Sequence, residues 1–324
     1  MLQSPQLINT MGAAMQTETL NLATLSPLFA DEEAARKFLE AQRWPNGPVC
    51  PRCGSEKAYA LTAKPESKKP VRKGVYCCAK CRKQFTVRIG TIFEDSHIPL
   101  NKWLMAFHLM SSSKKGISSM QLHRELGITL KSAWFLSHRI RESMAEKHSD
   151  LLCGTIEADE TYVGGKPRKG SGTPKRGRGT DKTPVMALVE RDGRVRSHPL
   201  ERVNAKALKG AIFENVDRSS HIMTDEFPAY NGIGMFYRSH KKVNHSEGEY
   251  VREDVNTNTA ESFFAILKRG HYGIFHSLSK QHLFRYCNEF AFRWNNRKVT
   301  DGERMVEAIK GAEGKRLMYR QTAN

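Results

Sequence analysis

At 324 residues the chain is too long for one small module, and at about 100–200 residues per domain we expect two or three domains. Hydrophobic residues make up 39% and charged residues 27% of the chain, which allows packed cores and excludes wholesale disorder. No apolar run approaches the ~18 residues of a membrane span, and the N-terminus shows no secretory signal. We therefore expect a cytoplasmic protein with no membrane partner.

The positive charge is large and unevenly distributed. Lysine and arginine number 52 against 34 acidic residues, which gives a net charge of +18. Residues 45–100 hold 11 basic and 4 acidic side chains, and residues 164–184 hold 7 basic and 1 acidic. Clustered positive charge favours a polyanionic partner, most often nucleic acid. A solvated basic surface is the alternative interpretation.

The first predicted element is a short amphipathic helix from Phe29 to Trp44. Asp31 can cap this helix, and Phe38 and Leu39 supply its apolar contacts. Residues 1–25 show little pattern.

Two Cys-x-x-Cys knuckles follow this helix. The first is Cys50-Pro-Arg-Cys53 and the second is Cys78-Ala-Lys-Cys81, with 24 residues between them. Each knuckle can direct two thiolates at one ion, and four thiolates complete a tetrahedral zinc site with no open position for chemistry. We therefore predict a structural Zn²⁺ ion, with Cys77 as a less well-spaced extra candidate. A pair of redox dithiols is the alternative, but it fits a βαβ context better than this Lys/Arg-rich hairpin.

A helical segment that could bind DNA comes next. After Pro99, apolar residues from Trp103 to Met110 recur at helical spacing. Two further predicted helices, Met120–Leu126 and Thr129–Met144, are joined through a short turn at Gly127 and make a helix-turn-helix candidate. The second of them carries three candidate DNA-binding residues: Lys131, Arg139 and Arg141. Packing of three helices without any DNA contact is the alternative.

Strand and helix patterns alternate between residues 149 and 300. The predicted strands cover residues 154–163, 184–189, 194–200 and 221–225, and the predicted helices cover residues 204–213, 260–269 and 279–297. A strand hairpin, a helix, a further strand and C-terminal helices resemble the ribonuclease H-like fold. The sequence therefore predicts an α/β multidomain protein, with a zinc ribbon and a helix-turn-helix-like segment followed by a mixed-sheet domain of this type.

In the ribonuclease H-like fold the first strand, the fourth strand and a later helix each carry one acid. Asp159, Asp225 and Glu261 occupy these three places. Lys268 lies seven residues after Glu261, almost two helical turns, so the two side chains share a helix face. The resemblance implies a catalytic site in which the acids hold metal ions and Lys268 reaches a phosphate.

Other acids could serve as metal ligands instead. Glu157 shares a strand face with Asp159, because side chains alternate along a strand. Glu160 points to the other face, and Glu226 directly follows Asp225.

Several blocks of the sequence are similar to bacterial insertion-sequence transposases of the DDE class that carry an N-terminal zinc ribbon, the ISXO2-like group. The resemblance covers about residues 30–300. The blocks that carry it are Arg43-Trp44-Pro45, Cys50-Pro51-Arg52-Cys53-Gly54, Arg88-Ile89-Gly90-Thr91, Asp159-Glu160-Thr161-Tyr162-Val163-Gly164-Gly165-Lys166, Asp225 through Tyr230, Asn258-Thr259-Ala260-Glu261, Leu267-Lys268-Arg269-Gly270 and Glu289-Phe290 to Asn295.

This resemblance implies five segments along the chain. They are a leader with a short helix (1–44), a zinc ribbon (45–92), a helical DNA-binding segment (93–148), a ribonuclease H-like catalytic domain (149–300) and a C-terminal tail (301–324).

The resemblance also implies the chemistry. Two Mg²⁺ ions about 3.5–4 Å apart activate the nucleophile and stabilise the leaving oxygen in phosphodiester cleavage. Asp159 would bridge both ions, with Asp225 completing one shell and Glu261 the other. Mn²⁺ can substitute for Mg²⁺. The expected activity is hydrolysis at the element end followed by strand transfer into target DNA, within a homodimer or a higher assembly on DNA.

Residues 164–184 are rich in glycine, proline and basic residues, and we interpret them as an arm that contacts phosphates beside the active site. The basic residues proposed for this role are Lys166, Arg168, Lys169, Lys175, Arg176 and Arg178. A disordered solubilising loop is the alternative.

Two rival functions stay open from the sequence. One is a zinc-ribbon DNA-binding regulator without catalysis, and the other is a structure-specific DNA nuclease on the same fold. A fold alone does not decide between such functions.

Overall fold

The computed structural model describes residues 20–62, 72–146, 150–165, 182–243 and 256–320. The chain divides into two compact units. The first unit comprises Met1–Lys114, Ser119–Met144 and Val299–Asn324, and the second comprises Lys115–Ser118 and Ala145–Lys298. None of the described helices combines the length and the apolar composition that crossing a membrane requires.

The described part of the first unit starts with the helices α2 (Leu22–Ala30) and α3 (Glu32–Arg43). The carboxylate of Asp31 accepts hydrogen bonds from the Glu33 and Ala34 amides in the first turn of α3, as its sequence predicts, and Phe38 and Leu39 are buried on the inner face. Helix α2 was not predicted, because residues 1–25 show little apolar periodicity.

A ribbon of three short antiparallel strands follows. The strands are β1 (Ala58–Ala60), β2 (Tyr76–Cys78) and β3 (Gln84–Phe85). The rings of Tyr76 and Phe85 stack with centroids 5.8 Å apart, and Trp44 meets both rings edge-on at 5.5 and 5.7 Å. These three rings are the main apolar contact of the ribbon, which is too small to bury a core of its own.

Four helices form the rest of the first unit. They are α4 (Leu100–Ser112), α5 (Ser119–Leu126), α6 (Leu130–Ser143) and α10 (Asp301–Lys310). The stripe from Trp103 to Met110 is core, with Trp103 and Met110 both fully buried. A turn containing Gly127 at φ 57° joins α5 to α6, so the predicted helix-turn-helix arrangement is present.

Helix α10 lies in the segment that the sequence assigns to a C-terminal tail. Its capping box pairs Thr300 with Glu303, and its apolar face packs against α4. The described part of this C-terminal tail is therefore part of the first unit.

The second unit is built on a five-stranded sheet in the order β6-β5-β4-β7-β8. The strands are β4 (Thr155–Val163), β5 (Thr183–Glu190), β6 (Val195–Pro199), β7 (His221–Asp225) and β8 (Ser239–Val243). β4, β5 and β6 pair antiparallel, whereas β7 and β8 run parallel to β4. The mixed sheet has the arrangement of the ribonuclease H-like fold, which confirms the predicted fold class.

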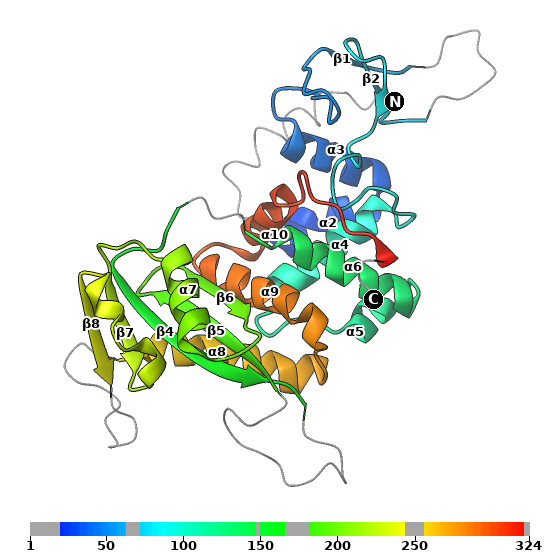
Figure 1. Cartoon of the computed structure of the whole chain (residues 1–324). Coiled ribbons are helices and arrows are strands. Elements are labelled where there is room, and N and C mark those ends of the chain that lie inside the picture. The colour runs from blue at the N-terminus through cyan, green and yellow to red at the C-terminus, as the bar shows by residue number, and fades with distance from the viewer. Residues whose placement is uncertain (1–19, 63–71, 147–149, 166–181, 244–255, 321–324) are drawn as a thin grey trace. The chain divides into compact units, whose positions relative to one another are not determined.

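Helices cover both faces of this sheet (Figure 1). The helices are α7 (Ala205–Asn215), α8 (Asn258–Gly270) and α9 (Leu283–Asn295), with short turns of helix at Pro228–Tyr230, Ile233–Met235, His271–Phe275 and Lys280–His282. Ile156 and Ala158 of β4 pack in the core under α7, whereas Val163 packs in the core under α8 and α9. Odd-numbered side chains of β4, including Asp159, therefore face α8.

Candidate functional site

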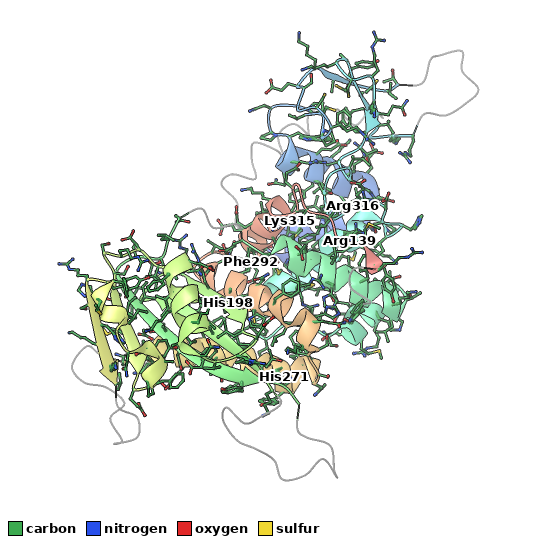
Figure 2. All side chains as sticks on the ribbon, in the orientation of Figure 1. Arg139, His198, His271, Phe292, Lys315 and Arg316 are labelled. Carbon is green, nitrogen blue, oxygen red and sulfur yellow. The ribbon has the colours of Figure 1, made fainter. Side chains whose placement is uncertain are left out.

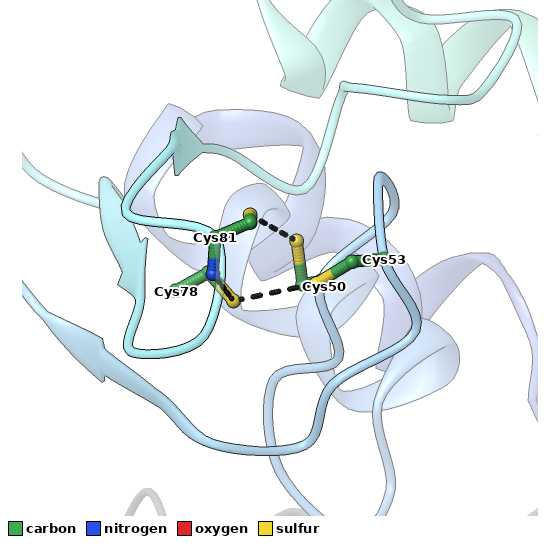
Figure 3. A group of neighbouring side chains, drawn as sticks. All are labelled: Cys50, Cys53, Cys78 and Cys81. Atoms are coloured by element: carbon green, nitrogen blue, oxygen red, sulfur yellow. Dashed lines mark hydrogen bonds between the residues drawn. The ribbon is translucent and has the colours of Figure 1, made fainter.

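The four predicted zinc ligands lie together. The sulfur atoms of Cys50, Cys53, Cys78 and Cys81 all lie within 4.8 Å of one another (Figure 3). Cys50 Sγ is 3.7 Å from Cys81 Sγ, and Cys53 Sγ is 3.6 Å from Cys78 Sγ. A tetrahedral site with Zn–S bonds of about 2.3 Å requires sulfur–sulfur separations of about 3.8 Å. The cluster therefore fits a structural zinc ion.

The local backbone prepares the second knuckle for metal. The Cys81 N–H donates to Cys78 Sγ at 3.4 Å, and this hydrogen bond lowers the pKa of the Cys78 thiol to about 6. The extra candidate, Cys77, is buried, and its sulfur lies near the Cys78 carbonyl oxygen instead of joining the cluster. The spacing argument against Cys77 agrees with this geometry.

Two of the three predicted catalytic acids stand level on neighbouring strands. β4 and β7 pair parallel, with Thr155 opposite His221 and Glu157 opposite Met223. Continuing that register by two residues puts Asp159 opposite Asp225, at the same height on the sheet. Asp225 ends β7, where its carboxylate accepts a hydrogen bond from the Phe227 N–H at 3.1 Å.

The third acid comes from the helix that covers this face. α8 packs against β4 and carries Glu261 in its first turn, with Lys268 two turns later. Loss of hydration on burial, and then the negative charges of Glu160, Asp225 and Glu261, raise the pKa of Asp159 to about 7. The Glu160 N–H, which donates to the Asp159 carboxylate at 2.7 Å, opposes this rise. The acidic cluster, defined as Asp159, Asp225 and Glu261, therefore lies in one electrostatic neighbourhood.

The carboxylate oxygens of the acidic cluster are not as close together as the sulfur atoms of the cysteine cluster. Among the described residues, only the cysteines form a group of three or more metal-binding side chains whose ligand atoms lie within 4.8 Å of one another. Like charges repel, and a divalent cation is what favours closer approach of carboxylate oxygens. Carboxylate oxygen is the ligand that Mg²⁺ prefers, so the donor set fits that ion.

The rival acids on β4 have other partners. Glu157 is fully buried and accepts hydrogen bonds from Arg191 Nε at 2.8 Å and from the Thr259 N–H at 2.8 Å. Glu160 faces the opposite side of the sheet, where its carboxylate accepts a hydrogen bond from the Tyr230 hydroxyl at 2.7 Å. These contacts favour Asp159 over Glu157 and Glu160 as the metal ligand that β4 contributes.

The raised pKa of Asp159 predicts a pH-dependent stability of the protein without added Mg²⁺. In the folded state Asp159 binds a proton up to about pH 7, whereas in the unfolded chain it loses the proton near its usual pKa of 3.8. The folded state therefore holds more protons between these values, and its stability falls as the pH rises through that window, by at most about 4 kcal/mol.

The Asp159→Asn variant removes this titration. We expect the variant to melt at a higher temperature than the wild type at pH 8, and the difference to shrink towards pH 5.5, in melts of zinc-loaded protein in metal-depleted buffer. A difference between the two proteins that stays constant across this range contradicts the raised pKa.

Two of the three predicted DNA contacts on α6 are buried. Arg139 is 4% exposed and Arg141 is 1% exposed. The Arg139 guanidinium lies 5.5 Å from the Trp103 ring and 5.3 Å from the Phe135 ring, and burial lowers its pKa to about 10. Arg141 donates to the Ser137 hydroxyl at 2.9 Å. Both side chains pack inside the first unit, which disfavours the predicted contact of these two arginines with DNA.

The C-terminal segment, residues 315–319, lies against α6 and was not anticipated. Lys315 Nζ donates to the last carbonyls of α6, those of Glu142 at 3.0 Å and Ser143 at 3.3 Å. Arg316 pairs with Glu94 at 3.3 Å, and Lys315, Arg316 and Arg139 lie in the same region of the unit (Figure 2).

The third predicted contact on α6 is exposed at the start of that helix. Lys131 is an exposed residue whose Nζ lies 4.5 Å from the centre of the Tyr319 ring. In helix-turn-helix proteins the N-terminal residues of the second helix reach the DNA. Of the three residues, Lys131 is the one whose position still suits DNA contact.

These placements predict that Arg139→Ala affects stability, whereas Lys131→Ala affects DNA binding. Arg139→Ala is expected to lower the free energy of unfolding by about 2 kcal/mol, because it removes a packed stem and its ring contacts. Lys131→Ala is expected to change stability by less than about 0.5 kcal/mol and to reduce the salt slope of DNA binding by about one. Urea unfolding and binding titrations at several salt concentrations check both. Unchanged stability in Arg139→Ala contradicts the buried assignment.

Two segments of the chain match known families. Residues 151–295 match the family model of the ISXO2-like transposase domain, and residues 30–84 match that of the transposase zinc-ribbon domain. The chain therefore carries an ISXO2-like transposase domain preceded by a transposase zinc-ribbon domain.

The chain is also similar to a curated relative and to two solved structures. It is 29% identical over 283 residues to an uncharacterized protein in the transposable element ISH50 of Halobacterium salinarum, covering 82% of this chain and 91% of the relative. The Mos1 strand transfer complex matches at 14% identity over 61% of this chain and 78% of that chain, with a TM-score of 0.21. A pre-cleavage Mos1 transpososome matches at 12% identity over 57% and 74%, with a TM-score of 0.18. Both scores are too low for a comparison of folds.

Residues 166–181 of the predicted basic arm lie outside the described residues. Its proposed phosphate contacts, Lys166, Arg168, Lys169, Lys175, Arg176 and Arg178, therefore stay predictions. The described chain resumes at Lys182, directly before β5.

Proposed function

We propose that this chain binds the ends of an insertion sequence and catalyses metal-dependent DNA cleavage and strand transfer with Asp159, Asp225 and Glu261. The observation that supports this most is the raised pKa of Asp159, to about 7, which is caused first by burial and then by the charges of Glu160, Asp225 and Glu261. A buried carboxylate with a raised pKa beside acids from other elements is typical of functional sites. The match to the ISXO2-like transposase domain supports the same assignment.

The proposed role of each site residue follows from its position in the fold. Asp159 lies on the central strand β4 and is proposed to hold both of two Mg²⁺ ions. Asp225 and Glu261 are proposed to hold one ion each. When bound, the ions make water or a 3′-hydroxyl nucleophilic and neutralise charge on the reacting phosphate. Lys268 shares a helix face with Glu261, where its ammonium group can contact a DNA phosphate.

DNA is the proposed partner of the basic surfaces. The zinc ribbon, the start of α6 around Lys131 and the basic residues between 166 and 178 are proposed to hold the duplex through its phosphates. Because both ends of an element must be processed, a homodimer or higher assembly on DNA is part of the proposal.

The test uses purified, zinc-loaded protein with labelled element ends and a supercoiled target plasmid. Mg²⁺-dependent cleavage at the end, followed by joining of the cut 3′ end to the plasmid, is the expected result. End binding without any cleavage supports the DNA-binding regulator instead. Cutting of branched DNA without end specificity or joining supports the structure-specific nuclease.

A further inference from the structure

The buried carboxylate of Glu157 joins the strand that carries Asp159 to the helix that carries Glu261. Its Oε2 accepts hydrogen bonds from the Thr259 N–H at 2.8 Å and the Ala260 N–H at 3.0 Å. Its Oε1 accepts from the Thr259 hydroxyl at 3.0 Å. Thr259 and Ala260 are the second and third residues of α8, so Glu157 caps this helix from a distant part of the chain.

Among the described residues, the local side chain of Asn256 binds only the first amide of α8, since its Oδ1 accepts from the Asn258 N–H at 3.3 Å. The residue at the N-cap position is Thr257, and its side chain makes no capping hydrogen bond. The Glu261 N–H donates to the Thr257 carbonyl at 3.0 Å, so Glu261 begins the regular hydrogen bonding of the helix directly after the two amides that Glu157 binds. The position of Glu261 is therefore tied to the position of the Glu157 carboxylate.

Arg191 completes the contact from the end of β5. Its Nε donates to Glu157 Oε1 at 2.8 Å, and its Nη2 donates to the Asn256 carbonyl at 3.2 Å. One guanidinium thus binds both the capping carboxylate and the backbone that leads into α8. Its positive charge and the partial positive charge of the helix N-terminus balance the buried negative charge of Glu157.

Glu157 and Asp159 lie on the same face of β4, two residues apart, which is about 7 Å along a strand. On this face of β4, the carboxylate of Glu157 binds α8, and the next carboxylate, that of Asp159, belongs to the acidic cluster. A helix shift that moved Glu261 away from Asp159 would have to break the hydrogen bonds of Glu157.

We propose that Glu157, held by Arg191, is a positioning residue that sets the distance between Glu261 and Asp159 and so the affinity of the acidic cluster for divalent cations. The inference rests on the proposed function. Glu157 itself does not contact the metal, because both of its oxygens are occupied by α8 and Arg191. It acts through the helix that carries Glu261.

Glu157→Gln tests the inference. The amide keeps the size of the side chain and one acceptor for the helix amides, but it removes the charge and places an N–H₂ donor where Arg191 donates. Loss of such an outer contact weakens metal affinity by about 10–100-fold. We expect this loss in a Mn²⁺ titration of the zinc-loaded protein, with free Mn²⁺ read from its electron paramagnetic resonance signal.

Two activity readouts follow from the same variant. The Mn²⁺ concentration for half-maximal end cleavage should rise by the same factor as the dissociation constant, and saturating Mn²⁺ should recover much of the rate. Binding of element ends should not change. Thr259→Val removes only the hydroxyl contact and should shift Mn²⁺ affinity in the same direction by a smaller factor, which keeps the test available if Glu157→Gln does not fold.

Glu289→Gln is the matched control. Glu289 is another fully buried glutamate, paired with Arg293 within α9. Its loss should lower the melting temperature and leave Mn²⁺ affinity unchanged. Mn²⁺ affinity within twofold of wild type in Glu157→Gln, with a lowered melting temperature only, overturns the positioning role while the proposed function stands. Wild-type Mn²⁺ affinity in Asp159→Asn overturns the proposed function and the positioning role together.

Discussion

Asp159→Asn is expected to lower the rate of end cleavage by about 1,000-fold or more and to leave end binding unchanged. The amide keeps the shape of the side chain but cannot supply an anionic oxygen to a divalent cation. Several kcal/mol of transition-state stabilisation depend on a correctly held metal ion, and each 1.4 kcal/mol corresponds to about tenfold in rate. Single-turnover cleavage of a labelled end measures the rate, and a band-shift titration measures binding.

The neighbouring glutamate provides the control for this variant. Glu160 directly follows Asp159, but its carboxylate lies on the opposite face of the sheet and accepts a hydrogen bond from Tyr230. Glutamine can accept the same hydrogen bond, so Glu160→Gln should cleave within about tenfold of wild type. If Glu160→Gln loses activity and Asp159→Asn keeps it, the metal ligand on β4 has been assigned to the wrong residue.

Cys78→Ser is expected to abolish zinc binding, to unfold the ribbon and to remove most of the affinity for DNA ends. The ribbon strands are only two or three residues long, so they cannot hold their structure by burial alone. A structural zinc site contributes roughly 10–16 kcal/mol of apparent binding free energy, which is also folding free energy. Zinc content, near-ultraviolet circular dichroism and end binding measure the three effects.

Cys77→Ser is the control for this second prediction, because Cys77 is adjacent in sequence but outside the cluster. The variant should retain about one zinc ion per chain and bind ends as the wild type does. Equal loss of zinc in both variants would show that the ribbon is sensitive to any substitution in β2, and would remove the support for Cys78 as a ligand.

Predictions from short-range sequence patterns were the most reliable ones. The two knuckles and the capping residue Asp31 act over a few residues, and their geometry follows from spacing. The strand that carries Asp159 and the helix that carries Glu261 are also visible from periodicity and from the resemblance to known transposases. The position of Asp159 opposite Asp225 depends on the register between β4 and β7, which no local pattern contains.

The features that the sequence did not predict depend on tertiary contacts. Periodicity shows that α6 is amphipathic, but not that other parts of the first unit would cover Arg139 and Arg141. The edge strand β8 was not predicted, because its sequence is polar and lacks the apolar alternation of a strand. It contains two lysines, a composition typical of a protected sheet edge. Glu157 is recognisable as a capping residue only when α8 is seen beside β4, because 102 positions separate it from Thr259.

The most direct test of the account is anomalous diffraction from crystals of the zinc-loaded protein soaked in Mn²⁺. The account predicts Mn²⁺ peaks bounded by the carboxylates of Asp159, Asp225 and Glu261, and no such peaks in Asp159→Asn crystals. Mn²⁺ bound elsewhere, with these three side chains left without metal in the wild type, would contradict it.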